Sequence, residues 1–477
     1  MPPAERPTEL FGAGSGRRSS LRTGATLAVT LLLAVGNGCR RSTPPQSQAA
    51  VAAAPNILLV LVDTLRADRL GTYGYGRPTS PEIDRFAAQS TLFESARSQA
   101  SCTFPSANSL LTSRYATRFL GQADRALGIP LEMPVLPEIL GRHGYSTAAV
   151  SASAIVRSNP SRYNRHGGFG RGFEVFEESC TWKSARCVNR QALAILDSRR
   201  LDRPFFLYLH FLDPHAPYRP PAGDALRFAT APRTKRHLRR GDPNELAKHV
   251  YGGHPERVDR DDLRVLSDLY DDEIRSFDGQ FAALLDEIER RKLTGTTVVV
   301  LAADHGEAFL EHGDIKHCRS VFDVEARVPL VIRVPGRAPQ RIARAVENIS
   351  LAPTLLALAG ISAEPYGLEG VDLFAEPAAS RPASSPAFSA QGRWRAATTE
   401  RHKLIYDLLH GTYALYDLVA DPGETVDVAS REPEVFRTLR AHLLRWIERV
   451  EGPGAATRSL AAASEAEREL KSLGYLE

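Results

Sequence analysis

Carboxylate and imidazole side chains follow three runs of apolar residues in this sequence. The runs span residues 56–62, 205–209 and 297–301, and the side chains at or shortly after their ends are Asp63, His210, Asp304 and His305. Carboxylates combined with an imidazole bind Mn²⁺, Zn²⁺ or Mg²⁺, whereas Ca²⁺ prefers oxygen ligands alone. Asp63, Asp304 and His305 therefore suit one divalent metal ion, whose identity among these four stays open. The alternative for a lone Asp at a strand end is a helix cap.

A hydroxyl group supplies the second kind of chemistry. Residues 101–114 read as a short loop that runs into a helix, with Pro105 suited to the first helical position. Thr103 then lies just before the helix, where free backbone N–H groups and the helix dipole attract an anion. The alternative is that Thr103 only caps the helix.

The elements that position these side chains form an α/β pattern. Five apolar runs read as buried strands, and they span residues 56–62, 147–150, 205–209, 297–301 and 328–332. Residues 136–144 and 261–291 carry helical patterns between them. Strands that alternate with helices predict a mostly parallel sheet covered by helices on both faces. Ligands collect beyond the carboxyl ends of such strands, so the side chains named above are expected to converge.

The first residues of the chain are expected to be an export signal. A basic start precedes an apolar run over residues 25–35, which is too short to span a bilayer comfortably. We assign residues 1–38 to a signal peptide and residues 39–54 to a flexible tether. Cys39 follows Gly38 and is a candidate for lipid attachment, with simple cleavage or a retained anchor as alternatives. The mature chain is then periplasmic or at the cell surface.

The remaining chain divides at a stretch rich in Ala, Ser and Pro. We expect a catalytic domain over residues 55–374, a linker over 375–390, and a C-terminal subdomain with a helical tail over 391–477. Strand patterns at residues 393–399, 402–407 and 412–418 predict a small antiparallel sheet in that subdomain, followed by an amphipathic helix over 434–450.

Charge and cysteine content limit the partners. A formal charge of +4 on 477 residues does not call for nucleic acid. The only membrane contact expected is the anchor at Cys39. The basic segment 233–240 is either a solvated loop or a rim that attracts an anionic substrate.

Cys180 and Cys187 are close enough in sequence to pair in an oxidising compartment.

Many motifs, in a consistent order, resemble the sulfatase family of the alkaline-phosphatase superfamily. The resemblance covers about residues 55–477. Its motifs are Asp63-Thr64-Leu65-Arg66, Thr79-Ser80-Pro81, Thr103-Phe104-Pro105-Ser106, Asp213-Pro214-His215-Ala216-Pro217-Tyr218, Asp304-His305-Gly306-Glu307, His312-Gly313, Pro353-Thr354-Leu355-Leu356, Leu415-Tyr416-Asp417-Leu418 and Leu470-Lys471-Ser472-Leu473-Gly474-Tyr475.

The resemblance implies an alkaline-phosphatase-like fold and a set of site residues. Metal ligands are implied at Asp63, Asp304 and His305, the nucleophile at Thr103, and catalytic histidines at His215 and His317. Arg114 and Lys316 are the nearest cations in sequence to two of these motifs, and they either bind the substrate anion or are solvated surface charges.

Three departures separate this chain from the usual sulfatases. Sulfatases carry C-x-P-S-R, whose Cys becomes formylglycine, but this chain has Thr103 at that position and Ala107 in place of the Arg. Cys102 is one residue too far from Pro105 to be that Cys and is expected to be a bystander. The family's G-K-W-H segment is missing, and Thr64 replaces the second Asp after the first strand.

The sequence therefore predicts a metal-dependent hydrolase that cleaves sulfate esters by in-line attack of Thr103. The substrate is a small anionic ester. The alternatives are a phosphodiesterase, a phosphomonoesterase or a phosphoryl head-group transferase, because relatives with Thr or Ser include such enzymes. A different class, a non-catalytic binding protein anchored at the surface, also fits the missing cations. The oligomeric state does not follow from the sequence.

Overall fold

The computed structural model describes residues 54–115, 117, 129–161, 163–164, 166–180, 185–198, 203–375, 385–452 and 455. The expected signal peptide, Cys39 and nearly all of the tether lie outside these residues, as does the expected tail motif at residues 470–475. Among the described residues, no helix combines the length and the hydropathy needed to cross a bilayer.

Within the described residues, an eight-stranded sheet runs in the order β10-β2-β9-β6-β1-β5-β3-β4. Its strands are β1 (Asn56–Val62), β2 (Thr91–Arg97), β3 (Ser146–Ser151), β4 (Val175–Glu177), β5 (Phe205–Phe211), β6 (Thr297–Ala303), β9 (Leu330–Arg333) and β10 (Gln340–Glu347). All neighbours pair in parallel except β9, which is antiparallel to β2 and β6. The predicted mostly parallel sheet is confirmed, and β2, β4 and β10 are strands that the sequence pattern did not reveal.

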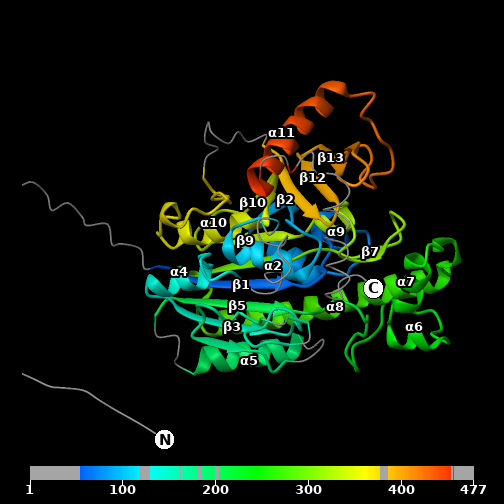
Figure 1. Cartoon of the computed structure of the whole chain (residues 1–477). Coiled ribbons are helices and arrows are strands. Elements are labelled where there is room, and N and C mark those ends of the chain that lie inside the picture. Colours follow the sequence, from blue (N-terminus) through cyan, green and yellow to red (C-terminus); the bar gives the residue numbers. More distant parts are fainter. Residues whose placement is uncertain are drawn as a thin grey trace, which may run out of the picture. The chain divides into compact units, whose positions relative to one another are not determined.

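Helices flank this sheet (Figure 1). They are α1 (Pro81–Ala87), α2 (Thr103–Thr112), α4 (Leu136–Arg142), α5 (Ala185–Asp197), α6 (Arg236–Arg240), α7 (Asn244–Tyr251), α8 (Arg260–Arg290), α9 (Asp323–Ala326) and α10 (Leu351–Leu358). One group packs α8 against α1 and α5, and another packs α2 against α4 and α10. β1, β5 and β6 lie at the centre of the sheet and are almost fully buried, which is why they are continuous apolar runs.

The basic segment 233–240 contains α6. Its Lys235 ammonium pairs with the carboxylates of Asp259 and Asp262 at 2.7 and 2.8 Å. The following helix, α7, lies against the short strand β8 (Ile315–Lys316), which pairs with β7 (Ala308–Phe309). The hydroxyl of Tyr251, the last residue of α7, donates to the Ile315 carbonyl at 2.7 Å. This insertion therefore supports the segment that leads to His317.

A second, four-stranded antiparallel sheet follows, as predicted. It consists of β11 (Ala387–Gln391), β12 (Trp394–Thr398), β13 (His402–Asp407) and β14 (Thr412–Asp417). The helix α11 (Pro433–Glu451) packs on β12 and β13, in orange and red in Figure 1. The linker expected over residues 375–390 is wrong at its end, because β11 begins at Ala387 and pairs with β12.

Candidate functional site

Two buried carboxylates lie side by side at the carboxyl edge of the sheet. β1 and β6 pair in parallel with Val62 opposite Ala303, so the next residues, Asp63 and Asp304, become neighbours. One ligand atom from each of Asp63, Asp304 and His210 lies within 4.8 Å of the other two. The strand register, rather than any local motif, brings these groups together.

Backbone groups hold the Asp304 carboxylate in place. Its Oδ1 accepts hydrogen bonds from the N–H groups of Thr64 and His305, at 3.1 and 2.8 Å. Thr64 adopts a φ of 57°, which is rare for a β-branched residue. The Tyr270 hydroxyl secures this conformation by donating to the Thr64 carbonyl at 2.7 Å. Strained backbone of this kind is typical of functional sites.

His305 presents its Nε2 to the two carboxylates. Its Nδ1 donates to the Gly306 carbonyl at 2.9 Å, which leaves Nε2 as the nitrogen that could ligate a metal. Nε2 lies 3.5 Å from Asp304 Oδ2 and 3.9 Å from Asp63 Oδ1. An imidazole whose other nitrogen donates to a carbonyl is the usual arrangement of a histidine that ligates a metal.

Thr103 lies at the start of α2 and contacts His305. Its Oγ1 is 3.2 Å from His305 Nε2. The helix begins at Thr103 itself, so the expectation that Pro105 takes the first helical position is wrong by two residues. The N-cap residue of α2 is Cys102, and its side chain makes no capping hydrogen bond. The Thr103 hydroxyl therefore faces the buried site, and the reading as a helix cap does not hold.

Ser106 fixes the first turn of α2 against the sheet. Its hydroxyl donates to the Asp304 carbonyl at 2.6 Å and lies 2.9 Å from the hydroxyl of Ser98. The position of Thr103 relative to Asp304 therefore depends on a short direct contact between α2 and the end of β6.

His210 belongs to this site although the expected ligand set omitted it. β5 extends to Phe211, so His210 is the second-last strand residue and lies opposite Leu61 of β1. Its Nε2 is 3.4 Å from Asp63 Oδ2, and its Nδ1 is 2.8 Å from the Tyr208 hydroxyl. Burial lowers the pKa of His210 to about 4, so the ring is neutral and has a lone pair to offer.

Two further histidines extend from His305 in a row. The ring of His317 lies 4.6 Å from that of His305, and the ring of His215 lies 5.1 Å from that of His317, centroid to centroid. His215 Nδ1 donates to the Ala216 carbonyl at 2.5 Å. His317 Nδ1 is 2.9 Å from a carboxylate oxygen of the fully buried Glu307, a residue to which the sequence assigned no role.

Burial and nearby positive charge lower the pKa values of His215 and His317. Burial first, and then the neighbouring His317, lower the pKa of His215 to about 3. Burial, His305 and Lys316, in that order, lower the pKa of His317 well below its ordinary value. Both rings are therefore neutral near pH 7, and the contact with the Glu307 carboxylate orients the ring of His317.

The two expected anion-binding cations lie in different places. Lys316 is next to His317 and its ammonium donates to the Asn244 side chain at 3.1 Å. Arg114 follows the far end of α2, where it donates to the Tyr366 carbonyl at 3.3 Å. A helix of this length spans about 15 Å, so the structure does not bring Arg114 together with Thr103.

The donor set fits a divalent cation. Among the described residues, Asp63 Oδ1 and Asp304 Oδ2 are buried oxygens without a hydrogen-bond partner. Burial first, and then Asp304, raise the pKa of Asp63 well above its ordinary value, as expected for uncompensated negative charge. Carboxylate oxygens and the bare Nε2 of His305 are the ligands that such a cation would take.

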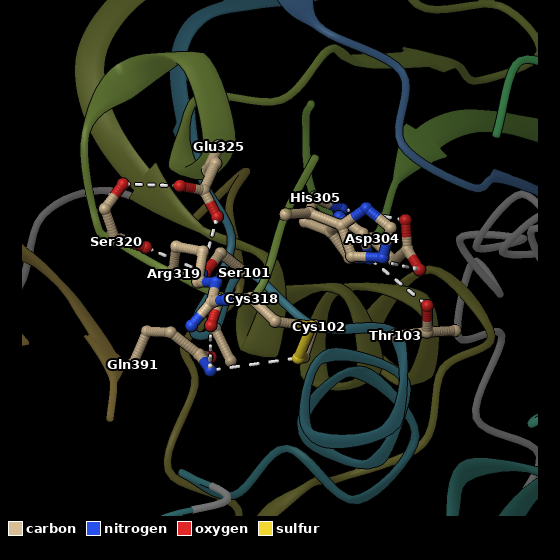
Figure 2. The surroundings of a disulfide bond; sticks show 12 residues. Ser101, Cys102, Thr103, Asp304, His305, Cys318, Arg319, Ser320, Glu325 and Gln391 are labelled. Atoms are coloured by element: carbon tan, nitrogen blue, oxygen red, sulfur yellow. Dashed lines mark hydrogen bonds and ion pairs between the residues drawn. A yellow bond between two sulfur atoms is a disulfide. The ribbon is translucent and has the colours of Figure 1, made fainter. Parts of the chain in front are cut away.

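A disulfide joins the neighbours of two predicted catalytic residues. Cys102 bonds to Cys318 across 216 positions of sequence, with 4.8 Å between the Cα atoms. The sequence did not predict this bond, which Figure 2 shows beside Thr103. The second disulfide joins Cys180 and Cys187, the pair that the sequence offered as candidates.

The parallel sheet, the strand-end carboxylates and the row of histidines define an ester hydrolase of the alkaline-phosphatase-like fold. The sulfatase family model matches residues 55–361. The model described as "N-sulphoglucosamine sulphohydrolase, C-terminal" matches residues 310–450. Because the first match spans more than half of the chain, this protein belongs to the sulfatase family and hydrolyses sulfuric or phosphoric esters.

Relatives and solved structures agree with this assignment. Iduronate 2-sulfatase of Mus musculus is 26% identical over 389 residues, which is 65% of this chain and 69% of that protein. Arylsulfatase A of Bos taurus is 27% identical over 369 residues, covering 72% and 70%. A protein solved in complex with its substrate D-glucosamine-2-N,6-O-disulfate has a TM-score of 0.66 at 17% identity, covering 85% of this chain and 100% of that one. A phosphonate monoester hydrolase from Silicibacter pomeroyi has a TM-score of 0.63 at 18% identity, covering 83% and 95%. These two structures share the fold.

Proposed function

We propose that this protein cleaves sulfate esters by in-line attack of the Thr103 hydroxyl on sulfur. The observation that carries the proposal is the position of Thr103 Oγ1, buried at the first turn of α2 and 3.2 Å from His305 Nε2. Free N–H groups at a helix N-terminus favour an anion at the same place. The nucleophile and the anion-binding groups therefore share one helix end.

Asp63, Asp304 and His305 would hold the divalent cation, with His210 close enough to join them. When bound, such a cation lowers the pKa of a neighbouring hydroxyl and neutralises the charge of the ester. Family membership supports this metal dependence. The test below also determines which of Mn²⁺, Zn²⁺, Ca²⁺ and Mg²⁺ is the metal.

The reaction requires two displacements. In the first, the Thr103 oxygen passes its proton to a neutral histidine, His215 or His317, and bonds to sulfur, and the bond between sulfur and the leaving oxygen breaks. The imidazolium then gives this proton to the leaving oxygen. In the second, water attacks sulfur while neutral His317 accepts its proton, the bond between sulfur and the Thr103 oxygen breaks, and the His317 imidazolium returns the proton to the Thr103 oxygen. Glu307 stabilises the imidazolium that forms on His317, because its carboxylate contacts Nδ1.

The substrate that we propose is a small anionic ester, and a sulfated sugar is the class that the relatives' names favour. The second candidate is phosphate-ester cleavage or transfer of a phosphoryl head group. It is favoured by Thr103 and Ala107, which stand where the usual sulfatases carry the formylglycine Cys and an Arg. The phosphonate monoester hydrolase supports it only at the level of the fold.

We also propose that the mature chain works in an oxidising compartment, periplasmic or at the cell surface, with Cys39 as a lipid attachment site. The two disulfides support this location, since disulfides persist in such compartments. Mass spectrometry of the N-terminal peptide from the native host tests it. An unprocessed N-terminus would contradict it.

The function is tested with purified protein and a panel of esters. 4-Nitrophenyl sulfate, 4-nitrophenyl phosphate and bis(4-nitrophenyl) phosphate are each assayed with Mn²⁺, Zn²⁺, Ca²⁺ and Mg²⁺. We expect the sulfate to give the highest kcat/KM, and Thr103→Ala to lose roughly 10³-fold or more in kcat with its metal retained. Preference for either phosphate would select the second candidate. Full activity of Thr103→Ala would remove Thr103 as the nucleophile.

A further inference from the structure

The Cys102–Cys318 disulfide, which we term the disulfide clamp, joins two catalytic segments. Cys102 directly precedes Thr103, and Cys318 directly follows His317. The Cys318 N–H also donates to the Ser101 carbonyl at 2.9 Å, so the two segments share a backbone hydrogen bond beside the sulfur bridge. Figure 2 shows the clamp next to the contact between Thr103 and His305.

The segment around His317 needs external support. Lys316 and Cys318 have φ angles of 73° and 69°, a region that L-residues other than Gly rarely adopt. Two such residues on either side of His317 persist only where the surrounding structure fixes them. By contrast, strand register and short contacts to the sheet hold Thr103 and His305.

Gln391 supports the clamp from the C-terminal sheet. It is the last residue of β11, and its side-chain amide donates to the Cys318 carbonyl at 3.2 Å. The same amide contacts the Cys102 sulfur at 3.8 Å. The amide is buried, and it contacts both halves of the clamp at once.

Glu325 supports the clamp from the other side. This fully buried carboxylate accepts from the Arg319 N–H at 3.1 Å and from the Ser320 hydroxyl at 2.5 Å. The Ser320 carbonyl accepts in turn from the Ser101 hydroxyl at 2.7 Å, and the Glu325 carbonyl accepts from the Gly306 N–H at 2.7 Å. Side-chain and main-chain groups of Glu325 thus link the residues after His317 to the residue after His305, and Ser320 extends the link to Ser101. Figure 2 shows Ser101, Arg319, Ser320 and Glu325.

We propose that the disulfide clamp is a positioning device for the reaction. It holds His317 at the distance from His305 and Thr103 that proton transfer to or from the reacting oxygen requires, with Gln391 and Glu325 as its supports. The proposed reaction uses no group of the clamp itself, so the clamp acts through His317. This inference rests on the proposed function of Thr103 and His317.

The test compares the two disulfides of this chain. Cys102→Ser/Cys318→Ser removes the clamp, and Cys180→Ser/Cys187→Ser is the matched control, since it removes a disulfide between the segment after β4 and the start of α5. We expect loss of the clamp to lower kcat about tenfold to hundredfold, with KM and bound metal changed less than about twofold. The control pair is expected to keep its kcat. A third variant, Gln391→Leu, keeps the clamp and is expected to lower kcat less.

Several outcomes would overturn the proposal. They are an unchanged kcat without the clamp, an equal loss of kcat in the control pair, or loss of the bound metal together with kcat. Should the clamp variant fail to fold by circular dichroism, Gln391→Leu decides: a lower kcat at unchanged KM supports the proposal and an unchanged kcat overturns it.

A readout without turnover separates this proposal from the proposed function. The ring nitrogen resonances of His317, followed by NMR in histidine-labelled protein, are expected to shift without the clamp and to stay unchanged in the control pair. A wild type that cleaves no ester in the panel would refute the proposed function, and the NMR result would still report whether the clamp positions His317. Unchanged His317 resonances would overturn the clamp proposal alone.

Discussion

Replacing Asp63 by Asn should stabilise the metal-free protein and remove most of the stabilisation that a bound metal gives. Asp63 and Asp304 are both almost fully buried, and each has an oxygen without a hydrogen-bond partner among the described residues. In protein treated with a chelator, the repulsion between the two carboxylates is uncompensated. An asparagine side chain has the shape of an aspartate without its charge, so the metal-free Asp63→Asn variant should unfold at a higher denaturant concentration than the wild type.

The magnitude follows from Coulomb's law. Two unit charges 4.8 Å apart, the outer limit of the ligand cluster, repel by roughly 3.5 kcal/mol at an effective dielectric constant of about 20. Because the pKa of Asp63 is raised, part of this repulsion is already relieved by protonation near neutral pH. We therefore expect the metal-free variant to gain roughly 1–3 kcal/mol. Metal at a hundredfold excess over Kd should stabilise the wild type by about 2.7 kcal/mol and stabilise the variant much less.

Urea unfolding followed by circular dichroism, with chelator and then with each metal, measures both effects. Asp278→Asn is the matched control, because this buried carboxylate on α8 accepts from the Ile83 N–H at 2.8 Å and lies outside the ligand cluster. It should destabilise the protein equally in both conditions. The reasoning is refuted if Asp63→Asn responds to metal as the wild type does, or if it destabilises the chelated protein as much as Asp278→Asn.

Three further predictions concern the surroundings of the site. His317→Asn should lower kcat roughly 10²-fold for 4-nitrophenyl sulfate, because the ring accepts the proton of the attacking water whatever the leaving group; an unchanged kcat would contradict the role of His317. Burial, followed by the charge of Lys403, lowers the pKa of His312 in the folded protein to about 4. Between pH 6.5 and pH 4 the unfolded chain binds a proton at this histidine and the folded chain does not, so the folded state loses stability as the pH falls through this range. Urea titrations of His312→Gln should therefore show roughly 2 kcal/mol less acid sensitivity than the wild type, and parallel pH curves would count against this. Gly306→Ala would place a Cβ in steric conflict with the Val324 carbonyl oxygen, so thermal unfolding should show roughly 2–3 kcal/mol of destabilisation and a weaker metal response. A metal response equal to that of the wild type would show that His305 had not moved.

The sequence predicted the centre of the fold because burial on both faces leaves a clear signal. β1 and β6 are uninterrupted apolar runs, and their register alone places Asp63 beside Asp304. β10 gave no such signal, since it is an edge strand in which charged residues interrupt the apolar ones and it is partly exposed. β2 carries a Glu and an Arg within a buried strand, which interrupts the apolar pattern.

The parts of the site that the sequence missed depend on long-range packing. His210 was noted at a strand end, but its contact with Asp63 follows from β5 extending to Phe211, a boundary that no local residue marks. Cys102 and Cys318 are 216 positions apart, and no spacing rule pairs two cysteines at that distance. Such contacts exist only once the sheet has assembled.

The C-terminal sheet is therefore better understood as part of the catalytic unit than as an appended module. Lys403 of β13 is fully buried, and its ammonium lies 2.8 Å from carboxylate oxygens of both Asp323 and Glu424. Asp323 also pairs with Arg97 at the end of β2, at 3.1 Å. Removing the C-terminal sheet would leave Asp323 without its Lys partner and the clamp without Gln391. Removing one partner of a buried charged pair destabilises a protein by about 3–5 kcal/mol. A catalytic domain that ends at residue 374 should therefore be unstable, and its His317 should be poorly positioned for catalysis.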